Sequence, residues 1–262
     1  MAYFSFKMSS AILHGNTTVD VILPDMKRGM SPREFYTPGK KFKVLWLLHG
    51  GGGDSSDWVR KSSIERYACD RELMVVMPDG RNSSYNNVEG YAMWDFMNEE
   101  LMPMVYSYFP ASEKREDNYV AGLSMGGHGA CHWAFAHPEK FQGMAAMSCG
   151  PFSIIRIMKG EQPLDNRGSM IARYNGDLEA AAREDYWCLA KEMMDGGDPV
   201  PKMYFAAGTE DPLKTARDMK FFEEYASEIG LKAKFEYDPG SHSWEFWDEH
   251  IQHALKFFFD ES

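Results

Sequence analysis

The sequence predicts an α/β fold, in which helices cover both faces of a mostly parallel β-sheet. Short, continuously apolar runs, typical of strands buried on both faces, recur along the chain. Segments with apolar residues at helical spacing separate them, and this alternation is typical of parallel sheets. The 262 residues suffice for one large core, and 44% hydrophobic and 26% charged residues are ordinary for a globular protein. Residues 1–262 are therefore expected to form a single domain.

The expected strands are short apolar runs that end at glycine, proline or polar clusters. The first two alternate around His14-Gly15-Asn16, so they are expected to pair as an antiparallel hairpin. The later runs are almost continuously apolar, as in a buried parallel sheet. In chain order the expected strands cover residues 4–8, 17–23, 43–48, 73–77, 119–123, 143–147, 202–207 and 233–237.

The expected helices lie between these strands, where apolar residues recur every three or four positions. Ser55 or Ser56 is a candidate cap for the first helix, and helical spacing persists between residues 91 and 109 despite Pro103. Residues 24–41 and 81–90 are polar or rich in proline and glycine, and are expected to be loops. The helices are expected over residues 58–67, 91–109, 129–135, 215–229 and 244–259.

The residues Gly122-Leu123-Ser124-Met125-Gly126 stand where an apolar run passes directly into a helical pattern. They form a G-x-S-x-G motif, which holds a serine on a sharp strand-to-helix turn with its Oγ exposed. Glycines suit positions where a Cβ would collide with neighbouring backbone. Ser124 is the expected nucleophile, and a plain glycine-rich turn is the alternative.

A nucleophilic serine needs a base and an acid that orients the base, and after such an elbow the acid precedes the histidine along the chain. Asp211 lies just after the second-last expected strand, and His242 just after the last. Both would emerge at the carboxyl edge of the sheet, as Ser124 does. His242 is the expected base and Asp211 the expected acid, with Glu210 and Asp238 as alternatives for the acid.

Four glycines follow His49 at the end of the expected strand at 43–48. Glycines allow the backbone to approach a reacting carbonyl group. The backbone N–H groups of Met125 and Gly51 are the expected oxyanion donors, with Gly52 as the alternative to Gly51. Removing one such donor typically costs about 2.7–4 kcal/mol of transition-state stabilisation. His49 itself is expected to be a structural hydrogen-bonding residue.

Four motifs together resemble the esterase D-type α/β-hydrolases: residues 49–58, 122–127, 208–211 and 240–244. This group includes tributyrin esterases, S-formylglutathione hydrolases, feruloyl and acetylxylan esterases, and mycolyltransferases. The similarity runs over nearly the whole chain and implies an α/β-hydrolase fold. It also implies short-chain acyl esters, or acetyl and hydroxycinnamoyl (feruloyl) esters of sugars or small alcohols, as substrates.

The expected activity is that of a serine carboxylesterase that works through an acyl-enzyme and needs no metal or organic cofactor. Because binding pockets are commonly lined by aromatic residues, four of them are candidates for substrate contacts: Trp58, Tyr85, Trp94 and Trp187. An acyltransferase or an S-formylglutathione-type thioesterase with the same triad is the main alternative. Peptide hydrolysis and a non-catalytic binding protein with this fold are less favoured.

Residues 151–200 are the least regular part of the chain. Short helical patterns at 178–188 and 189–194 are interrupted by glycine and proline. We expect a small helical insertion that covers the active-site edge of the sheet rather than an independent domain.

Charge and cysteine content narrow the partners and the compartment. The net charge of −11 argues against nucleic acid and anionic membranes as partners. Four widely spaced cysteines without a C-x-x-C pair favour reduced thiols, and no signal peptide is visible, so a cytoplasmic location is expected. A small-molecule ester is the expected partner, and the aromatic content gives a weak indication of a homo-oligomer.

Overall fold

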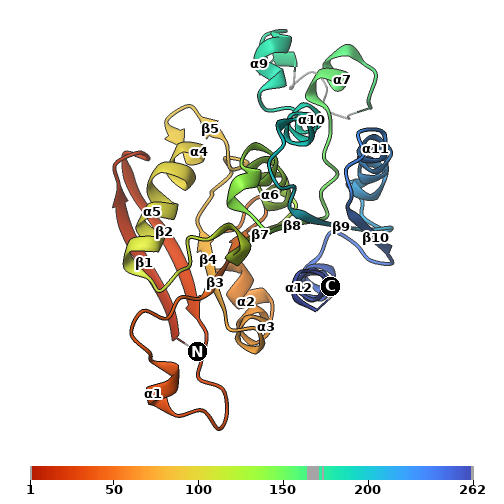
Figure 1. Cartoon of the computed structure of the whole chain (residues 1–262). Helices are drawn as coiled ribbons and strands as arrows, with labels where there is room; N and C mark the ends of the chain where they lie inside the picture. The colour runs from red at the N-terminus through yellow and green to blue at the C-terminus, as the bar shows by residue number, and fades with distance from the viewer. Residues whose placement is uncertain (1, 164–170, 173, 261–262) are drawn as a thin grey trace.

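The computed structural model describes residues 2–163, 171–172 and 174–260, and its centre is an eight-stranded sheet (Figure 1). The strand order is β1-β2-β4-β3-β7-β8-β9-β10. The hairpin of β1 and β2 is antiparallel and joins β4 in antiparallel register, whereas every pairing from β4 to β10 is parallel. The prediction of a mostly parallel sheet is confirmed. The bounds are β1 Ala2–Ser10, β2 Gly15–Leu23, β3 Lys43–Leu48, β4 Leu73–Pro78, β7 Asn118–Leu123, β8 Gly143–Met147, β9 Lys202–Gly208 and β10 Lys234–Asp238.

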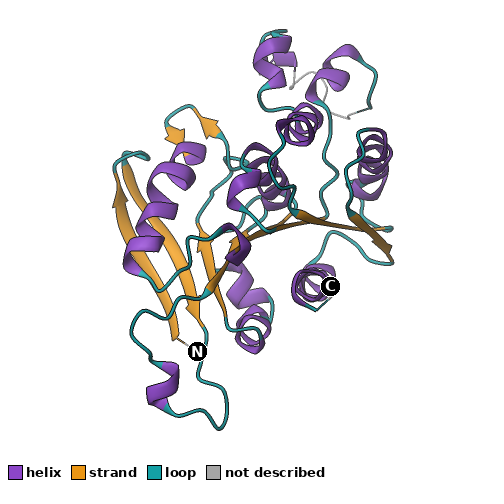
Figure 2. Ribbon diagram, in the orientation of Figure 1, coloured by secondary structure: helices purple, strands orange, loops and turns teal. Residues whose placement is uncertain are grey.

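Helices pack on both faces of this sheet, as Figure 2 shows. Each face has its own apolar core. One core lies under three helices: α2 (Asp57–Lys61), α3 (Ile64–Asp70) and α12 (Trp244–Phe259). The other lies under α5 (Met102–Tyr108), α6 (Met125–Ala136), α10 (Tyr186–Gly196) and α11 (Thr215–Glu228). The central strands are apolar on both sides because both sides are covered.

The helix expected over residues 58–67 is divided into α2 and α3. Ser62 takes an extended backbone conformation, with φ −138° and ψ 176°, and its Oγ donates to the Trp58 carbonyl at 2.5 Å. The N–H of Ser63 donates to Asp248 Oδ1 at 2.8 Å, so α12 supplies the partner that a continuous helix would have supplied. Serine side chains compete in this way with helical hydrogen bonds.

The helix expected over residues 91–109 begins two residues late and contains a wider turn. A short hairpin of β5 (Asn87–Val88) and β6 (Tyr91–Ala92) comes first, and α4 (Met93–Asp95) then leads into a π-helical turn at Phe96–Leu101. Pro103 follows directly at the start of α5. Because proline has no N–H to donate to the preceding turn, the wider turn accommodates it without ending the helix.

Short elements complete the described chain. They are α1 (Pro32–Phe35) within the expected loop at 24–41, 3₁₀ turns at Arg115–Asp117 and Pro138–Lys140, α7 (Ile154–Lys159) and α9 (Leu178–Ala182). None of the helices in the described ranges is long and apolar enough to cross a membrane.

The expected insertion at 151–200 contributes α7, α9 and α10, while its residues 164–170 and 173 lie outside the described residues. The boundary expected between the helical patterns at 178–188 and 189–194 is wrong, because α9 ends at Ala182 and α10 runs from Tyr186 across the expected break. The N-cap residue of α10 is Asp185, which is fully buried. Its carboxylate accepts the N–H groups of Trp187 and Cys188 and also the Ser153 hydroxyl at 2.8 Å. This one buried carboxylate ties α10 to the start of α7.

Candidate active site

Ser124 lies on the turn between β7 and α6 in a strained backbone conformation, with φ 50° and ψ −117°. Its N–H donates to the Met147 carbonyl of β8 at 2.8 Å, which fixes the turn to the sheet. The flanking glycines are required by close backbone contacts. A Cβ on Gly122 would lie 2.2 Å from the Gly126 carbonyl oxygen, and one on Gly126 would lie 2.4 Å from that of Leu48. Sharp turns of this kind are typical of nucleophile elbows.

Gly126→Ala is expected to lower the free energy of unfolding by about 3 kcal/mol, because the new methyl group meets backbone atoms that cannot rotate away. Urea denaturation measures the change. Gly196→Ala is the matched control, since nothing lies within 4 Å of its Cβ position and the residue sits in α10. The control is expected to be neutral or stabilising by up to about 1 kcal/mol. Equal midpoints for the two variants would contradict the close-contact argument.

The structure brings Ser124, His242 and Asp211 into one hydrogen-bonded series. His242 Nε2 lies 2.9 Å from Ser124 Oγ, and His242 Nδ1 lies 2.8 Å from Asp211 Oδ2. Because an ionised carboxylate only accepts, the Nδ1 atom carries the proton and Nε2 accepts from the serine hydroxyl. The ring also packs edge-to-face on Trp247, with the centroids 5.0 Å apart. This tautomer suits a base that takes the serine proton.

Asp211 is held by more than the histidine. Its side chain is fully buried, Oδ1 accepts the Leu213 N–H at 2.8 Å and Oδ2 accepts the Thr215 hydroxyl at 2.6 Å. The two alternatives for the acid lie elsewhere: Glu210 is exposed, and the Asp238 carboxylate faces His250 at 3.6 Å. The structure thus places Asp211, rather than either alternative, against His242.

Main-chain hydrogen bonds join the two loops that carry the acid and the base. The N–H of Thr209 donates to the Asp238 carbonyl at 2.9 Å, and that of Glu210 donates to the Gly240 carbonyl at 3.0 Å. These bonds extend the parallel pairing of β9 and β10 beyond the sheet edge.

The glycine loop after β3 is shaped by hydrogen bonds to three side chains. His49 Nε2 accepts the Gly80 N–H at 2.9 Å, so its Nδ1 carries the proton and donates to the Gly50 carbonyl at 2.7 Å. The Gly52 N–H donates to Asn82 Oδ1 at 2.7 Å, and the Tyr85 hydroxyl donates to the His49 carbonyl at 3.1 Å. His49 therefore has the structural role expected from the sequence.

The N–H groups of Gly51 and Met125 differ from that of Gly52. Within the described residues, neither takes part in a backbone or side-chain hydrogen bond, whereas the Gly52 N–H is engaged by Asn82. Gly51 lines the same pocket as Ser124, and Met125 begins α6, whose first N–H groups lack helical partners. The geometry therefore favours Gly51 over Gly52 as the second donor.

Ser124 opens into a pocket of about 470 Å³. The glycine loop, Ser124 and the residues around His242 form its walls, and an Asp57–Lys61 ion pair of 2.8 Å lies at its side. Lys61 Nζ lies 5.3 Å from the centroid of the Trp244 ring. The lining residues are Gly50, Gly51, Gly52, Gly53, Asp57, Lys61, Leu123, Ser124, His242, Ser243, Trp244, Glu245 and Trp247.

The four aromatic candidates for substrate contacts are not part of this lining, and a role for them in binding substrate stays a prediction. Trp58 and Tyr85 are fully buried and hydrogen-bond to the backbone of β3 or its following loop, behind the pocket wall. Trp94 stacks on His132, with the centroids 4.1 Å apart. Trp187 stacks on Tyr225 and donates to the Pro151 carbonyl. Each of these four side chains packs against or hydrogen-bonds to other parts of the protein. The sequence pattern alone does not predict such tertiary contacts.

Burial shifts the pKa values of two groups beside the elbow. Burial lowers the pKa of His128 on α6 to about 4, so this histidine stays neutral near pH 7. Its ring packs against Phe152 and Tyr186. Burial likewise raises the pKa of the Tyr85 hydroxyl well above its usual value, which keeps it a hydrogen-bond donor to His49.

Several residues of the site were missed by the sequence analysis. Thr215 and Asn82 hold the acid and the glycine loop, while Trp244 and Trp247 line the pocket. A signal existed only for Trp244, which belongs to the motif after His242. The partners of Thr215 and Asn82 arise from tertiary contacts between separate loops.

A serine elbow with a histidine and an aspartate at the carboxyl edge of a mostly parallel sheet defines the α/β-hydrolase class. A family model described as "Putative esterase" matches residues 10–258, and the chain belongs to this esterase family. The predicted resemblance is thereby confirmed, and the protein is a carboxylic ester hydrolase.

Individual relatives agree with this assignment. An acetyl esterase from Caldicellulosiruptor saccharolyticus is 30% identical over 275 residues, which cover 98% of this chain and 97% of the relative. The structure of an S-formylglutathione hydrolase from Staphylococcus aureus is similar with a TM-score of 0.81 and 29% identity, over 98% of both chains. A ferulic acid esterase with a TM-score of 0.77 and 21% identity covers 99% of this chain and is itself covered to 97%, a likeness of fold alone.

Proposed function

We propose that the protein is a serine carboxylesterase that cleaves acetyl and other short acyl esters of polar alcohols through an acyl-enzyme on Ser124. The observation that carries this proposal is the Ser124–His242–Asp211 series, with contacts of 2.9 and 2.8 Å beside two N–H groups free to bind an oxyanion. The acetyl esterase relative supports the choice of a short acyl group.

The reaction begins when Ser124 Oγ attacks the ester carbonyl while His242 Nε2 takes the hydroxyl proton. Asp211 stabilises the imidazolium and keeps Nδ1 protonated. The N–H groups of Met125 and Gly51 bind the oxyanion. His242 then gives its proton to the leaving alcohol as the C–O bond breaks. Water repeats the sequence against the acyl-enzyme, releases the acid and restores the Ser124 hydroxyl.

The pocket walls support a polar leaving group. The Asp57–Lys61 ion pair and Glu245 offer hydrogen-bonding groups, and Trp244 offers an aromatic face of the kind on which sugar rings pack. An alcohol with several hydroxyl groups fits this combination better than a long aliphatic one does. We further propose that the chain acts as one domain, with residues 151–200 as its helical insertion at the active-site edge.

A thioesterase acting on S-formylglutathione is the second candidate, since a hydrolase of that kind has the similarity reported above. The test measures kcat/KM for p-nitrophenyl acetate, p-nitrophenyl butyrate, acetylated and feruloylated sugars, and S-formylglutathione. Rapid acid quench and peptide mass spectrometry locate the acyl group. Acetyl on the peptide containing Ser124, with acetylated sugars among the best substrates, is the expected result.

Three outcomes would overturn the proposal. A kcat/KM for S-formylglutathione far above that of every oxygen ester would favour the thioesterase. Acyl transfer to an added sugar in preference to water would make the protein an acyltransferase. Absence of an acyl-enzyme with every substrate would remove the mechanism.

A further inference from the structure

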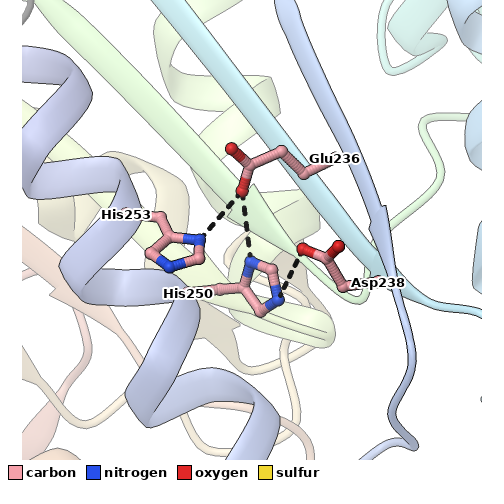
Figure 3. A group of neighbouring side chains, drawn as sticks. All are labelled: Glu236, Asp238, His250 and His253. Carbon is pink, nitrogen blue, oxygen red and sulfur yellow. Dashed lines mark hydrogen bonds and ion pairs between the residues drawn. The ribbon is translucent and has the colours of Figure 1, made fainter.

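Two acidic residues and two histidines meet outside the active site, where β10 packs against α12. They are Glu236, Asp238, His250 and His253, and one ligand atom from each lies within 4.8 Å of the others (Figure 3). Residues two apart in a strand share one side, and residues three apart in a helix share one face. The spacing along each element therefore directs all four side chains into the same place.

The distances within the cluster are short. Glu236 Oε2 lies 3.0 Å from His253 Nδ1 and 3.5 Å from His250 Nδ1. His250 Nε2 lies 3.6 Å from Asp238 Oδ2, so the His250 ring stands between the two carboxylates, as Figure 3 shows. His250 is only 1% exposed, whereas the Asp238 side chain is 49% exposed and His253 41%. The cluster thus has a buried wall and a side open to ions from solvent.

One ring nitrogen of a neutral His250 lacks a hydrogen-bond donor in this arrangement. A neutral imidazole has one N–H, so His250 donates on one side only, and its other nitrogen offers a lone pair. Both sides of the ring meet acceptors: the Tyr204 hydroxyl oxygen at 2.9 Å and Glu236 face Nδ1, and Asp238 faces Nε2. The lone pair on His250 Nε2 and the carboxylate oxygen of Asp238 repel each other. A cation bound between them would instead be coordinated by both atoms.

We propose that Glu236, Asp238, His250 and His253 bind one divalent transition-metal ion, with Zn²⁺ as the best-fitting example. Two imidazoles and two carboxylates are ligands that Zn²⁺ takes, at about 2.0–2.2 Å. The two carboxylate charges balance the charge of the ion. Hard cations such as Mg²⁺ and Ca²⁺ prefer all-oxygen sites and fit this donor set less well.

Neighbouring groups orient the proposed ligands. Lys234 pairs with Glu236 Oε1 at 3.2 Å, which leaves Oε2 directed at the histidines. The Tyr204 hydroxyl donates to that same Oε2 atom. Hydrogen bonds of this kind fix ligand orientation in metal sites. The ion would fasten α12 to β10, the two elements that flank the loop carrying His242.

The test is calorimetric titration of untagged, chelator-treated full-length protein with ZnCl₂, accompanied by thermal unfolding with and without the metal. One Zn²⁺ per chain and a higher Tm with Zn²⁺ than with MgCl₂ are expected. Because loss of a residue that only orients a ligand costs about 10–100-fold in affinity, His253→Gln and Asp238→Asn are each expected to cost at least about 100-fold. Both side chains are partly exposed, so neither change disturbs the core.

His137→Gln is the matched control, because His137 also faces a carboxylate, that of Glu139 at 3.1 Å, but has no second histidine beside it. It is expected to bind Zn²⁺ as the wild type does. Unchanged affinity in His253→Gln and Asp238→Asn, or no stoichiometric binding by the wild type, would overturn the proposal. The cluster would then be a hydrogen-bonded tether between β10 and α12. These readouts do not depend on esterase activity.

Discussion

Ser124→Ala is expected to lower kcat on the order of 10⁶-fold and to remove the nitrophenol burst that the wild type is expected to give when it is mixed rapidly with p-nitrophenyl butyrate. The Oγ atom that forms the acyl bond is gone, and its contact with His242 is gone with it. The two backbone N–H donors remain, so some acceleration over water is expected to survive. Stopped-flow absorbance measures the burst, whose amplitude in the wild type is expected to equal the enzyme concentration.

The variant His242→Ala and the double variant Ser124→Ala/His242→Ala test this prediction more stringently. Residues that act as a unit are not additive, so each single change and the double change are expected to have nearly the same kcat. Ser9→Ala, an exposed serine on β1, is the control and is expected to keep the full burst. A Ser124→Ala variant with activity within tenfold of the wild type would remove Ser124 from the mechanism.

Asp211→Asn is expected to lower kcat about 10⁴-fold while the fold stays intact. The amide has nearly the same shape, but its NH₂ group favours a proton on His242 Nε2 rather than Nδ1. His242 would then present an N–H to the serine hydroxyl. Its Nε2 atom, which lies 2.9 Å from Ser124 Oγ, could no longer accept the serine proton. Steady-state kinetics with p-nitrophenyl acetate and circular dichroism of both proteins measure activity and fold.

The neighbouring acid supplies the control for this change. Glu210 is exposed, and its backbone N–H, not its side chain, bonds to Gly240. Glu210→Gln is therefore expected to keep kcat within about twofold of the wild type, as surface changes usually have small effects. A large loss in Glu210→Gln together with a small one in Asp211→Asn would reverse the assignment of the acid.

Strong, repeated patterns made much of the fold predictable from the sequence. The strand at Lys43–Leu48 and the helix at Trp244–Phe259 have the expected bounds, because burial on both faces or on one helical face shows directly in the residue pattern. The break at Ser62 was not predictable, because it depends on Asp248 far along the chain. The π-helical turn before Pro103 was likewise not predictable, because the sequence does not show how the helix accommodates the missing N–H of the proline.

The candidate site divides in the same way. Ser124, Asp211 and His242 each follow a strand, so chain order and the common sheet edge make these three candidates predictable from the sequence. The roles of the three residues stay predictions until the variants are measured. The aromatic candidates had no such constraint: Trp187 is as apolar in a core as in a pocket, and only the structure places it against Tyr225. The type of a side chain therefore predicts a role in the site only weakly unless the position of the residue relative to the strands is also known.

The backbone bonds from Thr209 to Asp238 and from Glu210 to Gly240 have a mechanical consequence. They hold the loop of the acid against the loop of the base, so main-chain bonds as well as the side-chain contact constrain the separation of Asp211 and His242. The turn of Ser124 is bonded instead to β8, which pairs with β9 in the same sheet. Within the described residues no main-chain hydrogen bond joins this turn directly to the His242 loop, so the contact between Ser124 Oγ and His242 Nε2 is the less constrained of the two. Warming is expected to loosen that contact before it loosens the aspartate–histidine pair.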